Sequence, residues 1–312
     1  MNRLLATVFA ATATASASAA QNPPTPYAPG ALDITIPTTP TSNFDHADFR
    51  LWIPAGAGTL KALLVLVPGS NGEGRRMADD TLWQSFATRN HAAIIATRFT
   101  DKPHDQSFIE DYVAVSRGSG QALLDAIDSL AVRAKHPELR NAPLLLWGMS
   151  AGGQFNYEFT AWKPERVAAF VVNKGGIYYS ALVPRAARDV PGLLFIGGKD
   201  LESRVATITG LFAVNRRGGA LWALTEEPSA GHAVARSAQL GAMFFEDVLK
   251  LRLDDSGTLK RLDEKDGWYG DIHSKVVTAV GTQKAPTAPT AWLPSERLAK
   301  AWLAVVTDTP FR

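Results

Sequence analysis

The sequence predicts an α/β protein with a mainly parallel, doubly wound sheet that is flanked by helices. Short continuous apolar runs alternate with longer stretches of helical periodicity through the middle of the chain. Such runs are typical of strands that are buried on both faces of a parallel sheet. Hydrophobic residues make up 46% of the 312 residues, which is ample for the core of one large domain.

The N-terminus is typical of a secretory signal peptide. A basic start at 2–3 precedes an apolar stretch at 4–11, and 17–19 form an A-x-A cleavage site. The apolar stretch is too short to span a bilayer. We therefore expect residues 1–20 to be a signal peptide that is cleaved near Ala19. The mature protein is then secreted or periplasmic, and bacterial.

Six apolar runs are interpreted as strands of the sheet. They are residues 60–67, 92–99, 144–147, 167–172, 193–196 and 221–225. Before and beside them, 33–36 and 49–53 are expected to add an antiparallel edge. Helical periodicity covers residues 79–90, 112–135, 207–215 and 234–251. No later segment is long and apolar enough to be a membrane helix.

The C-terminal segment carries weaker signals. Residues 282–294 are rich in Thr, Ala and Pro and are predicted to form a loop. Residues 295–306 are predicted to be a helix with Ser295 as N-cap and with Trp302 and Leu303 facing inward.

We expect a single domain over residues 21–312, with its core at about 45–252 and an extension, 253–312, packed on it. The net charge of +2 gives no reason to expect nucleic acid as a partner. The absence of cysteine excludes disulfides, thiolate metal sites and a Cys nucleophile. No metal-binding motif is present, so no metal is expected, and no signal indicates an oligomeric state.

The segment Gly-Met-Ser-Ala-Gly at 148–152 is the strongest functional signal. This G-x-S-x-G pattern directly follows the apolar run at 144–147 and precedes a helix-like stretch at 154–162. Strand, tight turn and helix together make a nucleophile elbow, whose strained turn projects the serine into a cleft. Ser150 is therefore the candidate nucleophile.

A serine nucleophile needs a base and an acid that orients the base, and in this kind of fold their chain order is Ser, acid, His. Asp200 follows the apolar run at 193–196, so it is expected on the same rim of the sheet as Ser150. We predict Asp200 as the acid, although aspartate is also common in turns and at helix N-caps. Glu202 is the nearest rival, and Glu226 is a weaker one.

His232 is the candidate general base. It lies among small residues on a loop after the last apolar run, which leaves room for an imidazole. His273 also follows Ser150 but lies in the charged C-terminal segment. The remaining histidines precede Ser150 and break the expected order: His46, His91, His104 and His136.

The oxyanion hole needs one N–H from the residue after the nucleophile, which is Ala151. A second should come from the loop after the first core strand, at 68–74, where glycines let the backbone approach a substrate. Ser70 is the first choice for this donor and Asn71 the second. The loop matches neither nucleotide-binding pattern, G-x-G-x-x-G or G-x-x-x-x-G-K-[ST].

Residues from about 45 to 252 resemble the α/β-hydrolase superfamily through the loop at 67–72, the elbow at 148–153, Asp200 and His232. The loop begins with Pro-Gly where the family usually has His-Gly. Within the superfamily, the signal peptide and the Gly-Met-Ser-Ala-Gly-Gly segment resemble secreted bacterial serine esterases. These include the polyhydroxybutyrate-depolymerase, feruloyl-esterase and dienelactone-hydrolase-like groups. The resemblance implies ester hydrolysis through an acyl-enzyme, without a cofactor.

The segment at 175–190 is where this fold often inserts a lid. It is short here, so we expect a lightly covered cleft that suits a small-molecule or polymeric ester. Gly69 and Met149 are expected to border the substrate. Tyr178 and Tyr179 are placed to stack on an aromatic acyl group, although ordinary packing explains them equally well.

Two alternatives remain open. The first is a serine peptidase or aminopeptidase of the same fold. Oligopeptidases of that type usually carry a large additional N-terminal domain, and only about 150 residues precede Ser150 here. The second is a catalytically silent binding protein, because a fold does not determine a function.

Overall fold

The computed structural model describes residues 32–106, 109–254, 257–282 and 289–311. The predicted signal peptide lies outside these residues. Within them, eight strands form the main sheet, in the order β1-β2-β4-β3-β5-β6-β7-β8. The strands are β1 (Asp33–Thr35), β2 (His46–Trp52), β3 (Ala62–Val67), β4 (Ala92–Thr100), β5 (Leu144–Met149), β6 (Val167–Asn173), β7 (Gly192–Gly197) and β8 (Trp222–Glu227).

The sheet is parallel except at one edge. Strands β3 to β8 run parallel to their neighbours, whereas β2 pairs antiparallel with β4, and β1 pairs antiparallel with β2. The predicted antiparallel edge is therefore present. Because β3, β5, β6, β7 and β8 all run the same way, the loops that follow them emerge along one rim of the sheet.

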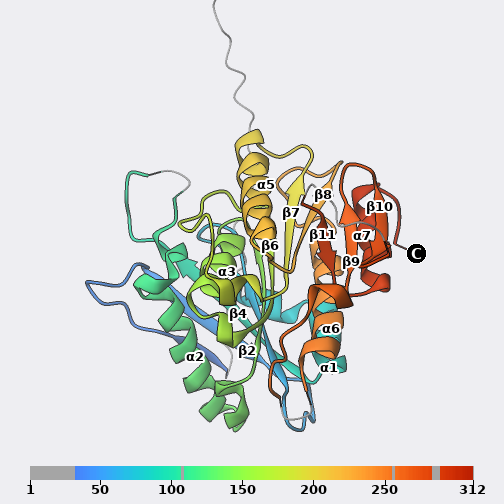
Figure 1. Ribbon diagram of the computed structural model, residues 1–312. Coiled ribbons are helices and arrows are strands. Elements are labelled where there is room, and N and C mark those ends of the chain that lie inside the picture. Colours follow the sequence, from blue (N-terminus) through green and yellow to red (C-terminus); the bar gives the residue numbers. More distant parts are fainter. Residues whose placement is uncertain (1–31, 107–108, 255–256, 283–288, 312) are drawn as a thin grey trace, which may run out of the picture. The chain divides into compact units, whose positions relative to one another are not determined.

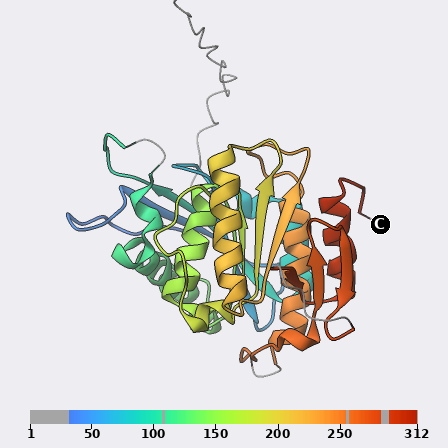
Figure 2. The same cartoon turned by 45° about the horizontal axis from the view of Figure 1, so that its top comes forward.

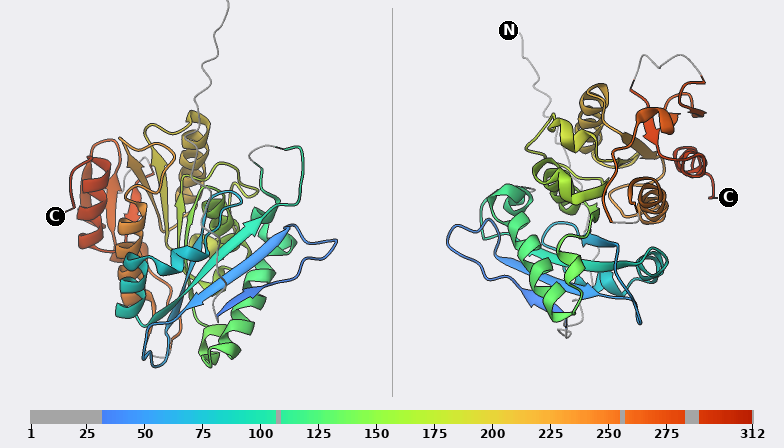
Figure 3. Two further views of the ribbon diagram at one scale, coloured as in Figure 1. Left: turned by 180° about the vertical axis from the view of Figure 1, so that it is seen from behind. Right: turned by 60° about the horizontal axis from the view of Figure 1, so that its bottom comes forward.

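Helices cover both faces of the sheet, as its doubly wound class predicts. On one face lie α2 (Ser119–Arg133), α3 (Ala151–Trp162) and α5 (Glu202–Arg217), as Figure 1 shows. On the other lie α1 (Thr81–Arg89), α6 (Ser237–Arg252) and α7 (Glu296–Val306), which are seen from behind in Figure 3. No described helix is long and apolar enough to cross a membrane.

The apolar runs supply two cores, because alternate side chains of a strand point to opposite faces of the sheet. Leu63 and Val65 of β3 pack into the core under α2 and α3, whereas Leu64 and Leu66 pack into the core under α1 and α6. All four side chains are fully buried. A strand that is apolar on both faces fits only an interior position in a sheet covered on both sides.

Two helices differ from their predicted limits. The helix predicted over 112–135 begins only at Ser119, because Gly118 has a φ of 139°, through which a helix cannot continue. Residues 111–117 form short 3₁₀ turns instead. The helix predicted over 207–215 is longer, since α5 begins at Glu202, directly beyond the loop of Asp200.

The C-terminal segment holds structure that the sequence did not predict. Strands β9 (Trp268–Asp271), β10 (Val276–Ala279) and β11 (Ala291–Leu293) form a small antiparallel sheet, visible in red and orange beside β8 in Figure 2. The loop prediction for 282–294 is therefore wrong at β11. A short helix, α4 (Arg185–Arg188), follows β6.

The last helix follows its prediction closely. The Ser295 hydroxyl accepts a hydrogen bond from the N–H of Leu298 at 3.0 Å, which caps α7. Trp302 is fully buried, and its indole N–H donates to the carbonyl of Leu224 in β8 at 2.9 Å. Leu303 is only partly buried. Residues Ala31–Arg312 cluster as one compact unit.

Candidate active site

Ser150 occupies a strained turn between β5 and α3. Its backbone has φ 54° and ψ −121°, a conformation that costs a non-glycine residue energy. Its N–H donates to the carbonyl of Asn173 at 2.8 Å, and its own carbonyl accepts from Gly153 and Gln154 in the first turn of α3. These backbone bonds hold the turn in the nucleophile-elbow geometry that the pattern predicts.

The glycines on either side of Ser150 let backbones pass at close range. A Cβ on Gly148 would lie 2.2 Å from the carbonyl oxygen of Gly152. A Cβ on Gly152 would lie 2.2 Å from the carbonyl oxygen of Val67 at the end of β3. Neither distance leaves room for any side chain, so the elbow and the loop after β3 approach each other through bare backbone.

Gly152→Ala is therefore expected to lower the free energy of unfolding by about 1–3 kcal/mol or more, because backbone must move to admit the methyl group. Gly210→Ala is the matched control, since Gly210 lies in α5 with open space around it. The control should raise stability by about 0.5–1 kcal/mol through helix propensity. Urea unfolding measures both changes, and an equal stability of the two variants would contradict the close packing at the elbow.

Asp200 and His232 meet on the loops that follow β7 and β8. His232 Nδ1 lies 3.0 Å from Asp200 Oδ2. The Asp200 side chain is 3% exposed and the His232 side chain 33% exposed, so the imidazole is held from the protein side and open to solvent on the other. Glu202, the rival acid, is exposed at the start of α5, and the structure brings Asp200 rather than Glu202 to His232.

The environment of Asp200 keeps its carboxyl ionised. Burial raises the pKa of the group, but the hydrogen bonds from His232 and from the N–H of Leu201 outweigh burial and hold the pKa below its ordinary value. Arg204 adds a further bond to the other carboxylate oxygen at 2.7 Å. A carboxylate held in this way can orient the imidazole and stabilise its cationic form.

The loops after β3, β5, β7 and β8 thus bring Ser70, Ser150, Asp200 and His232 to the same rim of the sheet. The chain therefore has a serine on a strand–turn–helix elbow, followed by an acid and then a histidine on later loops. This order and this placement are typical of one fold. The fold is that of the α/β-hydrolases. No hydrogen bond joins the hydroxyl of Ser150 to His232, both of which the structure describes. In hydrolases without substrate this contact is often long and shortens in the complex.

No family model matches the sequence, and none of the curated proteins matches it significantly. Similar solved structures include esterase PE8, with a TM-score of 0.49 and 20% identity over 64% of this chain and 98% of the other. The poly(3-hydroxybutyrate) depolymerase LpqC from Bordetella parapertussis has a TM-score of 0.47 and 17% identity, covering 69% and 90%. A thermostable esterase has a TM-score of 0.48 and 17% identity over 62% of this chain, and the match spans only about half, 53%, of that esterase.

A cavity of about 970 Å³ opens at this rim. Ser150 and His232 line it, as do Gly69, Ser70 and Met149. Side chains that the sequence did not single out complete the wall; they are Glu110, Gln154, Ile177, Leu201, Ser203, Arg204 and Thr207. Of these, Arg204 has a spacing in the sequence that could have identified it. It lies four residues after Asp200, a separation at which opposite charges often pair, and its guanidinium forms an ion pair with that carboxylate.

The structure does not bring Tyr178 and Tyr179 to this cavity. The hydroxyl of Tyr178 is buried, and its ring packs edge-to-face on Tyr157 with centroids 4.9 Å apart. Tyr179 is 48% exposed and borders a separate hollow beside Arg117 and Trp162. Both side chains therefore pack or face solvent as ordinary aromatic residues do, which is the interpretation that the sequence had left open.

The two backbone segments that the sequence predicts to supply oxyanion donors lie beside Ser150. Ala151 begins α3 directly after Ser150, where helical N–H groups have no partner within the helix. On the facing loop, the N–H of Asn71 donates to the hydroxyl of Tyr112 at 3.3 Å, and Asn71 does not line the cavity. Ser70 does line it, and this arrangement favours Ser70 over Asn71 as the second donor.

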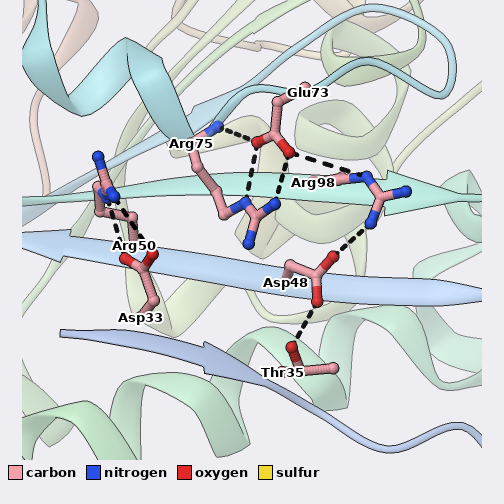
Figure 4. Close-up of polar contacts among 7 residues, drawn as sticks. All are labelled: Asp33, Thr35, Asp48, Arg50, Glu73, Arg75 and Arg98. Carbon is pink, nitrogen blue, oxygen red and sulfur yellow. Dashed lines mark hydrogen bonds and ion pairs between the residues drawn. The ribbon is translucent and has the colours of Figure 1, made fainter. Parts of the chain in front are cut away.

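The loop that carries Ser70 is anchored by charged side chains (Figure 4). The Glu73 carboxylate accepts hydrogen bonds from the N–H and the guanidinium of Arg75, and it faces Arg98 of β4 at 3.9 Å. Arg98 in turn bonds Asp48 of β2 at 2.6 Å. Partial burial raises the pKa of Glu73, but these contacts outweigh it and hold the pKa below its ordinary value. These contacts join the loop, three residues after Ser70, to strands β4 and β2.

Ser70→Ala tests whether the backbone or the side chain is the donor. Alanine keeps the N–H and loses only the hydroxyl, so the variant is expected to retain the parental kcat for ester hydrolysis. A loss of about 10²–10³-fold would instead identify the hydroxyl as the donor. Steady-state kinetics on one ester substrate distinguishes the two results.

Among the described residues, no group of three His, Asp or Glu side chains lies close enough together to hold a metal ion. Besides Ser150 and His232, the polar side chains that line the cavity are those of Ser70, Glu110, Gln154, Ser203, Arg204 and Thr207.

Proposed function

We propose that this protein is a serine carboxylic-ester hydrolase that acts through an acyl-enzyme. One observation carries the proposal: the strained Ser150 and the imidazole of His232, with Asp200 at 3.0 Å from its Nδ1, line the same cavity. A nucleophile, a base and an orienting acid in this order are the parts that acyl transfer requires.

In the proposed reaction, Ser150 Oγ attacks the ester carbonyl while His232 Nε2 takes the hydroxyl proton. Asp200 keeps the imidazole in the tautomer that bears hydrogen on Nδ1 and stabilises the imidazolium. The N–H groups of Ala151 and Ser70 bind the oxyanion. The imidazolium then protonates the departing alcohol, and water releases the acid from Ser150 by the same steps in reverse.

The cavity supports an ester with a sizeable acyl or alcohol group. Its volume of about 970 Å³ is at the upper end of small-molecule sites, and apolar side chains such as Met149, Ile177 and Leu201 form part of its wall. We propose aromatic or polymeric esters as the substrate class, and secretion of the mature protein into the periplasm or the medium.

A panel of matched esters and amides tests the proposal. Short-chain p-nitrophenyl esters should be hydrolysed, and feruloyl, terephthalate and polyhydroxyalkanoate esters should follow among larger substrates. Preference for aminoacyl anilides would favour a serine peptidase instead. A protein that reacts neither with the panel nor with a fluorophosphonate probe would be a silent binding protein.

A further inference from the structure

A fully buried lysine lies beside the proposed active site. Lys174 directly follows β6, has a positive φ of 56°, and is 0% exposed. Its ammonium group donates to Asn173 Oδ1 at 2.9 Å, to the carbonyl of Ala233 at 3.0 Å, and to the carboxylate of Glu227. An ammonium group has three N–H donors, so every one of them is used inside the protein.

The hydrogen bonds of Lys174 and Asn173 connect the turn of Ser150 with the loop of His232. Ala233 directly follows His232, so Lys174 binds the backbone of the histidine loop. Asn173 reaches the same carbonyl with its side-chain amide at 3.2 Å and the sulfur of Met149 at 3.0 Å. The carbonyl of Asn173 accepts the N–H of Ser150 at 2.8 Å. One cluster thus touches the elbow at Ser150 and the loop at His232.

Glu227 ties down the far end of the same loop. It ends β8, and its second carboxylate oxygen accepts the N–H of Arg236 at 2.7 Å. Between these points the loop packs against bare backbone, because a Cβ on Gly197 would lie 2.6 Å from the carbonyl of Ala230. Residues 228–236 are therefore held at Ala230, Ala233 and Arg236.

Stability alone does not account for a charged pair in this place. Removing an ammonium and a carboxylate from water is expensive, and apolar residues of similar volume often stabilise a protein as well or better. An apolar pair cannot make directed hydrogen bonds. In this cluster, Lys174 and Asn173 both donate to the carbonyl of Ala233, next to His232, and Asn173 also binds the N–H of Ser150.

We propose that Lys174, together with Asn173 and Glu227, is a positioning residue that sets the distance and angle between His232 and Ser150. The proposal rests on the proposed function. Lys174 does not line the cavity, so it does not contact the substrate and acts only through its neighbours. A displacement of about 1 Å of a reacting group can lower a rate by about 10²-fold, so the effect of losing the tether is measurable.

The test compares three variants with the parent protein. Lys174→Met removes the tether and leaves Glu227 buried without its partner. The double variant Lys174→Met/Glu227→Leu removes both charges, so it keeps the tether broken without an unpaired charge. Arg252→Met is the matched control. The Arg252 guanidinium is buried at the opposite end of the same strand, where it donates to the carbonyls of Val167 and Ala168 at 2.7 and 2.6 Å.

We expect kcat for a p-nitrophenyl ester to fall by about 10²-fold in both Lys174 variants, with KM little changed, because orientation rather than binding is lost. The double variant should recover melting temperature relative to Lys174→Met without recovering kcat. Arg252→Met should lose melting temperature and keep its kcat. Hydrogen exchange should quicken in the Lys174 variants alone at the amide of Ala233, which donates to the carbonyl of Gly231, a group that neither variant removes.

Parental kcat in the double variant would overturn the proposal, as would an equal loss of kcat in Arg252→Met. If Lys174→Met fails to fold, the double variant decides. An inactive parent protein that no fluorophosphonate labels would instead refute the proposed function. Hydrogen exchange at Ala233 would still decide the tether, because unchanged exchange in the double variant would show that Lys174 does not hold the loop.

Discussion

Replacing Ser150 by alanine is expected to lower kcat for ester hydrolysis by about 10⁶-fold. The proposed reaction passes through a covalent bond to Ser150 Oγ. Alanine has no hydroxyl to form this bond. Ser150 lies on the strained turn after β5, in the same cavity as His232. Alanine keeps the backbone N–H of residue 150 and its bond to Asn173, so the fold should be unaffected.

The measurement is hydrolysis of p-nitrophenyl esters by the parent and Ser150→Ala, purified side by side and compared by melting temperature. Backbone donors that remain can still bind an oxyanion, so a small residual rate above the uncatalysed one is consistent with the account. Parental activity in Ser150→Ala would show that the elbow does not carry the nucleophile. Ser274 is exposed and does not line the cavity, and Ser274→Ala serves as the control that should retain activity.

The second large effect is expected at the acid, where Asp200→Asn should lower kcat by about 10⁴-fold. The carboxylate accepts from His232 Nδ1 at 3.0 Å, and its lowered pKa keeps it ionised at neutral pH. An asparagine amide of nearly the same size can present N–H to the imidazole instead. The imidazole then takes the tautomer with hydrogen on Nε2, which cannot accept the proton of Ser150.

Glu202→Gln is the matched control for the acid. It removes one carboxylate two residues away, at an exposed position, and should change kcat by no more than about twofold. We measure kcat with one ester across the neutral pH range, so that a shift of the pH–rate profile is not mistaken for a loss of kcat. Equal losses in Asp200→Asn and Glu202→Gln would contradict the assignment of the acid.

Local patterns in the sequence were enough to predict the sheet and the elbow. A strand such as β3 is apolar on both faces, which fits only an interior strand, and Gly-Met-Ser-Ala-Gly after a strand indicates one particular turn. Residues on neighbouring strand ends then had to lie on one rim. The contact between Asp200 and His232 followed from this topology and not from any pairing signal in the sequence.

Other features depended on packing that the sequence does not display. The break at Gly118 and the small sheet of β9, β10 and β11 involve few residues, with no periodicity long enough to detect. The ring of Tyr178 packs on the buried ring of Tyr157, a contact between residues 21 positions apart that no local pattern predicts. Lys174 was overlooked because lysine is almost always a surface residue, and only the fold shows what its ammonium group meets.

The most direct test of the central claim is to find where a fluorophosphonate attaches. The parent protein is treated with the probe, its intact mass is measured, and the adduct is located by peptide mass spectrometry. We predict a single adduct, on Ser150, that is absent from Ser150→Ala and forms more slowly in Asp200→Asn. An adduct on another residue, or none on a preparation that hydrolyses esters, would contradict the account.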